Sequence, residues 1–189
     1  PSSAASDVYK RQVLYSAYHA SKDTDLYTET WKYIHNLFKD VGVDNVLWVW
    51  NPNHNSKPDY KWNHALAYYP GSEYVDIIGL TAYNTGTYYE GEVWSEFESL
   101  YDKMYEQYIE WFDHPFMITE FASSSIGGNK VEWIEGMFNS IEKYDRVKIA
   151  VWWSWQDFDV DKNPARIYFL DENKETTEAF RKGLKNFSN

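Results

Sequence analysis

The sequence predicts an α/β fold with a parallel sheet, and two observations lead to this prediction. Short apolar runs of strand length alternate along the chain with longer stretches whose hydrophobic residues recur at helical spacing. The expected strands start near positions 46, 75, 116 and 147, and intervals of about thirty to forty residues are typical of βα units. The 189 residues are enough for one domain with a sizeable core.

The first half of the chain is expected to contain two of these strands. A helix over residues 26–39 ends at Gly42, and a strand over residues 45–50 follows it and leads into a polar loop. A short helix over residues 61–69 then precedes a second strand over residues 74–80. The inward stripe of the first helix is expected to consist of Tyr27, Trp31, Ile34 and Phe38.

The second half is expected to contain the other two strands. Asn129 is the expected N-cap of a helix, because an Asn side chain can accept the free N–H groups of a first helical turn. A Ser/Gly loop over residues 123–128 lies between this helix and the strand before it. The expected elements are a helix over 95–112, a strand over 116–120, the capped helix through Tyr144, a strand over 147–153 and a helix over 175–187.

The residues with the most chemical potential fall at or just after the ends of the expected strands. They are Asn53, Tyr83, Glu120 and Trp155. Ligands bind at the carboxyl edge of the sheet in (β/α)8 barrels and in open α/β sheets, so a ligand site is expected there. Glu120, at the end of a buried strand, is either a satisfied structural group or a reactive group that faces a cleft, and the residues alone leave both alternatives open.

The composition favours a carbohydrate ligand. Ten Trp, 17 Tyr and 10 Phe make 20% of the chain aromatic, more than a core needs, and flat rings can stack on the apolar faces of sugars. Core packing is the alternative explanation for any single ring. The formal net charge of −11 makes nucleic acid a poor partner, because phosphate binding needs clustered Lys and Arg. No membrane partner is expected, since no stretch approaches the roughly 18 apolar residues of a transmembrane helix.

Several kinds of site lack their sequence motifs. The chain has no glycine motif for nucleotide phosphates and no nucleophile elbow, so no cofactor is expected. No metal site is expected either, because His54 and His64 do not have the spacing of zinc ligands. The alternating aspartates over residues 157–161 lack the glycine and the closing glutamate of a calcium loop, so this segment is expected to be a solvated loop.

Carboxylate chemistry in an aromatic-rich cleft remains, and it indicates glycoside hydrolysis. A retaining glycosidase needs a nucleophilic carboxylate and a second, protonated carboxyl group. Glu120 is the candidate nucleophile because a strand holds it rigidly. The hydroxyl of Tyr83, one strand earlier, is positioned to hydrogen-bond this carboxylate and keep it ionised.

Four runs of the sequence resemble glycoside hydrolase family 26, the β-mannanase and mixed-linkage β-glucanase family. They are VLWVWNPN, YYPGSEYVDIIGLTAYN, PFMITEFASSSIGG and AVWWSWQDFD. The resemblance extends from about residue 15 to the end of the chain, and it implies strands five to eight, the C-terminal half, of a (β/α)8 TIM barrel.

The same resemblance implies roles for individual residues. Glu120 matches the family's nucleophile, Tyr83 the tyrosine beside it, and Trp153 or Trp155 the aromatic floor under the sugar at the cleavage point. Asn53 and Trp50, from the end of an earlier strand, are further candidate substrate contacts.

The family's acid/base glutamate, which belongs to a His-Glu motif, has no counterpart here. Residues 13–19, VLYSAYH, contain no carboxylate. We therefore expect residues 1–12 to be a non-native, adaptor-derived segment and residues 13–189 to be a truncated catalytic domain. The expected protein is a fragment of a secreted endo-β-glycanase for plant β-mannan, weakly active or inactive alone. Self-association through exposed half-barrel edges is also expected.

Three alternatives stay open. Within the same family, the substrate could be mixed-linkage β-glucan or β-xylan instead of mannan. The chain could instead be a non-catalytic carbohydrate-binding domain, with stacking platforms at Trp50, Trp94, Trp153 and Trp155. It could also be a structural α/β domain in which Glu120 is merely satisfied by its neighbours.

Overall fold

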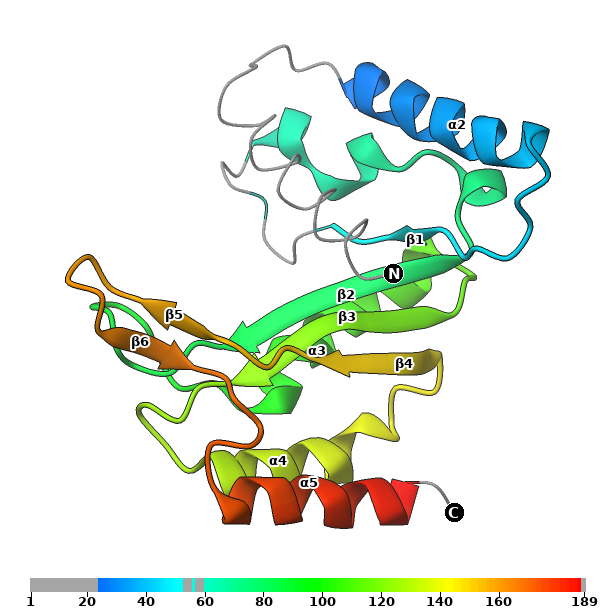
Figure 1. The fold of residues 1–189 in the computed structure, drawn as a ribbon. Helices are drawn as coiled ribbons and strands as arrows, with labels where there is room; N and C mark the ends of the chain where they lie inside the picture. Colours follow the sequence, from blue (N-terminus) through cyan, green and yellow to red (C-terminus); the bar gives the residue numbers. More distant parts are fainter. Residues whose placement is uncertain (1–23, 53–55, 57–59, 188–189) are drawn as a thin grey trace. The chain divides into compact units, whose positions relative to one another are not determined.

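The computed structural model describes residues 24–52, 56 and 60–187, in which helices and strands alternate (Figure 1). Four strands form one sheet in the order β1-β2-β3-β4, which is also their order along the chain. Their bounds are β1 Val49–Trp50, β2 Ile77–Asn84, β3 Phe116–Ser123 and β4 Val147–Trp152. The first two pair in parallel, with Val49 opposite Ile77. The predicted α/β class with a parallel sheet is therefore confirmed.

The chain divides into two compact units. The first contains the described residues up to Thr81 together with His114–Thr119, and the second contains Ala82–Asp113 and the residues from Glu120 onward. Strands β2 and β3 each pass from the first unit into the second.

The first unit is organised by two buried tryptophans. Trp31 lies on helix α2 (Thr24–Asp40), and its indole N–H donates to the carbonyl of Tyr74 at 2.9 Å. Trp50 of β1 donates in the same way to the carbonyl of Tyr68 at 3.1 Å. These bonds satisfy the indole groups while the rings fill the core. The predicted inward stripe of α2 is wrong at Ile34, which is 39% exposed.

Two expected elements of the first unit are shorter or different in type. The strand predicted over residues 45–50 is reduced to Val49–Trp50, because the Trp48 N–H donates to the side chain of Asp76 instead of to a neighbouring strand. The helix predicted over residues 61–69 is two short 3-10 helices, Lys61–Asn63 and Ala65–Tyr68.

The following strand is displaced along the chain. A third 3-10 helix, Ser72–Tyr74, occupies the start of the strand predicted over residues 74–80. Strand β2 therefore begins at Ile77 and continues to Asn84, so Tyr83 lies within the strand and not in a loop after it.

The core of the second unit is mainly aromatic. Helices α3 (Phe97–Trp111), α4 (Lys130–Ile141) and α5 (Lys174–Phe187) belong to this unit, and α4 and α5 lie side by side (Figure 1). Buried rings from α3, β3 and α4 contact one another edge to face or tilted; they are Phe97, Tyr101, Phe121 and Trp133. The predicted cap of α4 is confirmed, because the Asn129 side chain accepts from the Val131 N–H at 3.0 Å.

A β-hairpin follows β4, and it bears out the predicted solvated loop only in part, because residues 157 and 158 belong to its first strand and residues 159–161 to its connection. Strands β5 (Gln156–Phe158) and β6 (Pro164–Ile167) pair antiparallel. The carboxylate of Asp159 closes the connection by accepting from the backbone N–H groups of Asp161 and Asn163 at 2.9 and 2.8 Å. It also accepts from the hydroxyl of Tyr88 at 2.6 Å.

Strand β4 is largely exposed. Its apolar side chains Ile149 and Val151 are 41% and 39% exposed, whereas most side chains of β3 are buried. The predicted self-association stays a prediction. None of the described helices is both long enough and apolar enough to cross a bilayer.

Candidate active site

Glu120 and Tyr83 form a hydrogen-bonded pair on neighbouring strands. The Tyr83 hydroxyl donates to Oε2 of Glu120 at 2.6 Å, as expected from the sequence. Tyr83 is the only hydrogen-bond partner of the Glu120 side chain among the residues that the structure describes. Both side chains are half-buried. One carboxylate oxygen is thus held by a neutral donor, and the other is open to a further group.

The environment of Tyr83 keeps its hydroxyl protonated. Burial raises the pKa of Tyr83 well above its usual range, and the hydrogen bond to the Glu120 carboxylate raises it further. A tyrosine in this state is a reliable donor over the whole working pH range of an enzyme. It can orient the carboxylate and stabilise its negative charge without competing for a proton.

Tyr168 packs against Tyr83 and was not singled out by the sequence. The two rings lie 5.4 Å apart between centroids at an interplanar angle of 41°. Tyr168 is 4% exposed, and it follows directly after β6. Because β6 belongs to the hairpin that the sequence did not predict, no pattern indicated that this residue would return to Tyr83.

The two tryptophans after β4 are accessible, as a stacking role requires. Trp153 is 39% exposed and Trp155 is 56% exposed. The backbone N–H of Trp153 donates to the carbonyl of Phe121 at 2.8 Å, so this tryptophan lies beside the residue that follows Glu120.

The structure describes only one of the other two candidate substrate contacts. Trp50 is 1% exposed, and its ring contributes to the core of the first unit. Its role in substrate binding stays a prediction. Asn53 lies outside the described residues, as does His54.

Asn84 and Ser123, at the ends of β2 and β3, form a satisfied buried pair. Asn84 Nδ2 donates to Ser123 Oγ at 2.8 Å, and Asn84 Oδ1 accepts from the backbone N–H of Ser95 at 3.0 Å. Neither side chain is accessible. Their role is therefore to fix the loop after β2 to the end of β3.

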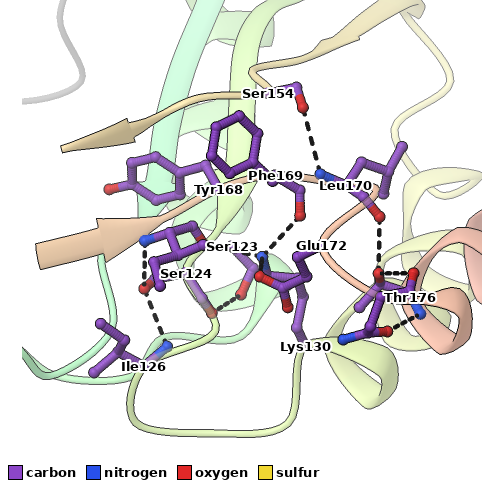
Figure 2. A network of polar contacts seen from close by, with 12 residues as sticks. Ser123, Ser124, Ile126, Lys130, Ser154, Tyr168, Phe169, Leu170, Glu172 and Thr176 are labelled. Carbon is purple, nitrogen blue, oxygen red and sulfur yellow. Dashed lines mark hydrogen bonds and ion pairs between the residues drawn. The ribbon is translucent and has the colours of Figure 1, made fainter. Parts of the chain in front are cut away.

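Lys130, the first residue of α4, holds the chain segment that follows β6 (Figure 2). Its Nζ donates to the carbonyls of Ile167 and Phe169 at 2.9 and 3.1 Å and to Oε2 of Glu172 at 2.9 Å. The side chain is 2% exposed. Burial lowers the pKa of Lys130, and the hydrogen bond with Glu172 acts in the opposite direction.

Arg166 joins the hairpin to the loop after β2. Its guanidinium pairs with Glu92 through Nε and Nη2 and with Asp157 through Nη1 at 2.8 Å, and it lies over the ring of Tyr89 at 4.8 Å. Burial opposes the charge of Arg166, but the hydrogen bonds to Glu92 and Asp157 outweigh it and raise the pKa. The loop after β2 and the strand β6, which Arg166 joins, are next in the chain to Tyr83 and Tyr168, respectively.

No three His, Asp or Glu residues among those described are close enough together to hold an ion. Asp157 and Asp159 are used instead by Arg166 and by the hairpin connection. The site thus consists of a carboxylate held by a tyrosine, with two exposed tryptophans directly after the neighbouring strand β4.

The sequence is similar to those of known proteins along most of its length. The family model for glycosyl hydrolase family 26 matches residues 15–172. The chain is 31% identical over 183 residues to endoglucanase H of Acetivibrio thermocellus. The aligned region covers 96% of this chain and 19% of the relative. The chain is 28% identical over 160 residues to a mannan endo-1,4-β-mannosidase of Bacillus subtilis, covering 84% of this chain and 33% of the relative.

Solved structures add a likeness of fold. The catalytic domain of a family 26 endo-β-1,4-mannanase from Bacillus sp. JAMB-750 superposes with a TM-score of 0.55 at 20% identity, over 86% of this chain and 44% of that one. The endo-β-1,4-mannanase of Thermotoga petrophila gives a TM-score of 0.50 at 14% identity, over 88% and 41%. The chain thus spans less than half the length of each of these relatives.

Proposed function

The chain belongs to glycosyl hydrolase family 26, a family of (β/α)8 barrel enzymes, and we propose that it carries the nucleophile side of a retaining endo-β-1,4-mannanase. The proposal rests on one observation, the pair of Glu120 and Tyr83, in which one carboxylate oxygen is held and the other is open. Strands five to eight of the barrel correspond in this proposal to β1, β2, β3 and β4.

In the proposed reaction, the open oxygen of Glu120 attacks the anomeric carbon of a mannosyl residue. The glycosidic C–O bond breaks through an oxocarbenium-like transition state, and a covalent glycosyl ester forms on Glu120. Tyr83 supports this step by holding Oε2, which leaves the other oxygen free and correctly turned. Trp153 and Trp155 are proposed to stack on the sugar rings, a role that fits their exposure.

The leaving oxygen must take up a proton, and retaining enzymes supply it from a carboxyl group about 5 to 5.5 Å from the nucleophile. We assign this general acid to none of residues 13–189. Residues 13–19, which resemble the segment that carries it in the family, contain no carboxylate. Natural polysaccharide should consequently be hydrolysed slowly or not at all by this chain, since general acid catalysis contributes typically about 10²- to 10⁴-fold.

An aryl glycoside tests the nucleophile separately from the missing acid. A 2,4-dinitrophenolate leaves without protonation, so 2,4-dinitrophenyl β-mannobioside should glycosylate Glu120 and release one equivalent of phenolate in a burst. The ester should accumulate, because the base that activates water in the second step is also missing. Mass spectrometry of the proteolysed protein should find the mannobiosyl group on the peptide that contains Glu120.

Azide provides a second readout of the same step. A small anion needs no general base, so azide should release the ester as a β-mannobiosyl azide with retained configuration. The Glu120→Gln variant should give no burst, no labelled peptide and no azide product. Glu110→Gln, which changes an exposed carboxylate on α3, is the matched control and should behave like the wild type. A burst that survives in Glu120→Gln would show that another group is the nucleophile.

Mixed-linkage β-glucan is the second candidate substrate. It is favoured because one relative is an endoglucanase, whereas the other is a mannan endo-1,4-β-mannosidase. The corresponding 2,4-dinitrophenyl β-cellobioside decides between the two, because the faster burst identifies the preferred sugar. A chain that binds oligosaccharides equally well before and after Glu120→Gln, with no burst from either glycoside, would instead be a carbohydrate-binding domain.

A further inference from the structure

Hydrogen bonds from three different parts of the chain fix the backbone around Tyr168. The N–H of Tyr168 donates to the carbonyl of Trp155 at 2.8 Å, and the Tyr168 carbonyl accepts from the indole of Trp152 at 2.9 Å. Lys130 holds the carbonyls on both sides, those of Ile167 and Phe169. The backbone position of Tyr168 is therefore set by β4, by the start of β5 and by α4 together.

A further contact ties the same segment to the loop after β3. The N–H of Ser125 donates to the carbonyl of Ile167 at 3.1 Å, and Ser124 Oγ accepts from the Ile167 N–H at 3.4 Å. Ser124 follows Glu120 closely in the chain, directly after the end of β3. Tyr168 is thus positioned relative to the carboxylate both through its ring contact with Tyr83 and through its backbone.

The hydroxyl of Tyr168 is not employed in any hydrogen bond that stabilises the described part of the protein. No hydrogen bond of this hydroxyl exists among the described residues, although the side chain is only 4% exposed. The only fully enclosed side-chain polar atom without a partner in the described residues is Nδ1 of His114. The Tyr168 hydroxyl also has no hydrogen-bond partner among the described residues but is absent from this enclosed class, so it is accessible although its ring is nearly buried.

A phenylalanine would serve a packing role at this position equally well. A hydroxyl at the edge of a nearly buried ring is poorly hydrated, and it gains a full hydrogen bond only when a ligand supplies the partner. Burial also raises the pKa of Tyr168, so the group stays a neutral donor, which suits the hydroxyl groups of a sugar. In Figure 2 the Tyr168 ring extends away from the Lys130 amine, so the hydrogen bonds of Lys130 to the neighbouring carbonyls do not involve the Tyr168 hydroxyl.

We propose that Tyr168 is a substrate-binding residue whose hydroxyl hydrogen-bonds a hydroxyl group of the sugar bound beside Glu120. Lys130 is a positioning residue for it, because it fixes the two carbonyls that flank Tyr168 without reaching the ligand. This inference rests on the proposed function, since it places the ligand at the Glu120–Tyr83 pair.

The test is a thermodynamic cycle that combines removal of the protein hydroxyl, in Tyr168→Phe, with removal of single sugar hydroxyls, in monodeoxy analogues. Binding of mannobiose and of its 2-, 3-, 4- and 6-deoxy analogues to the wild type and to Tyr168→Phe is measured by isothermal titration calorimetry. Loss of one neutral hydrogen bond should weaken mannobiose binding on the order of 2- to 10-fold. One deoxy analogue should bind both proteins equally, because it lacks the hydroxyl that Tyr168 contacts.

Tyr105→Phe is the matched control. It also removes a hydroxyl from a buried tyrosine, but this hydroxyl bonds Asp145 near the start of β4. Its affinities for the whole set should equal those of the wild type. A melting temperature of Tyr168→Phe within a few degrees of the wild type should accompany the weaker binding, since the ring is retained.

The outcomes separate this inference from the proposed function. If the wild type binds mannobiose and Tyr168→Phe binds every sugar as tightly, Tyr168 makes no sugar contact and only this inference is overturned. If the penalty is the same for mannobiose and all of its deoxy analogues, the effect is structural, and the inference is overturned as well. A wild type that binds neither mannobiose nor cellobiose, and shows no burst with either aryl glycoside, overturns both.

Discussion

Glu120 and Lys130 are charged side chains of the same unit that are held in opposite ways. Lys130 is 2% exposed on its side chain, and all three of its donors are used by two carbonyls and one carboxylate. Glu120 is half-buried, and among the described residues it has a single donor, Tyr83. The ammonium group has no capacity left for a ligand, whereas the carboxylate has an open oxygen.

This difference shows how a structural charge can be distinguished from a reactive one. Burial alone does not distinguish them, because the more buried of the two is the structural one. The number of hydrogen-bonding positions that the protein leaves unused is the better criterion. It predicts that changes at Lys130 act on folding and that changes at Glu120 act on chemistry.

The largest expected effect is on the reactivity of Glu120. Glu120→Gln should lower the rate of the aryl glycoside burst by about 10⁴-fold or more, because it removes the nucleophile. The free energy of unfolding should change by less than about 1 kcal/mol, since the amide oxygen can still accept from Tyr83. Stopped-flow absorbance and urea unfolding measure the two quantities, and a large loss of stability would contradict the distinction.

The second effect is on the stability contributed by Lys130. Lys130→Met leaves the carboxylate of Glu172 buried without its partner and should lower the free energy of unfolding by about 3–5 kcal/mol. Lys182→Met is the control, because its pair with Glu135 is exposed and should contribute less than about 1 kcal/mol. Adding Glu172→Leu to Lys130→Met should restore much of the loss. Equal melting temperatures for Lys130→Met and Lys182→Met would contradict the prediction.

The third effect concerns the single donor of Glu120. Tyr83→Phe should slow the burst by about 10- to 150-fold, the range for a hydrogen bond to a charged group, with little change in stability. Tyr88→Phe provides a close match, because this hydroxyl also lies 2.6 Å from a carboxylate, that of exposed Asp159. Its burst rate should equal the wild-type rate. Comparable slowing in both variants would mean that the hairpin, and not the bond to Glu120, controls the reaction.

The smallest effect is a local response to acid at Asp159, a charged group that is well bonded but exposed. The hydrogen bond from Tyr88, followed by those from Asn163, lowers the pKa of Asp159 from 3.8 to about 2. The bonds of this carboxylate are therefore present above about pH 4 and are lost as the pH falls through 2. Carboxyl carbon NMR should find a midpoint near 2, raised in Tyr88→Phe. A wild-type midpoint near 4 would exclude the predicted contact.

The sequence was sufficient where one local pattern decides the structure. The alternation of strands and helices, the N-cap at Asn129 and the position of Glu120 on a strand beside that of Tyr83 were all predicted. Each depends on residue type at a short spacing, or on the regular return of parallel strands.

The sequence was insufficient where distant residues decide. Strand β1 is short because the Asp76 side chain takes the N–H of Trp48. In the β5–β6 hairpin, Asp159 and Arg166 each have one partner in the distant loop after β2, Tyr88 and Glu92. Tyr168 was missed for the same reason. Its contact with Tyr83 joins residues that are far apart in the chain, and no periodicity indicates it.

The location of Lys130 at the first residue of α4 has a further consequence. The amino end of a helix carries the positive end of the macrodipole, so a cation there is unfavourable by about 0.3–1 kcal/mol at exposed sites. Considered as an isolated helix, α4 would be more stable with an acidic or neutral residue at this position. The conflict between local helix preference and tertiary structure marks a frustrated position. A substitution chosen to improve α4 alone would therefore release the segment that holds Tyr168.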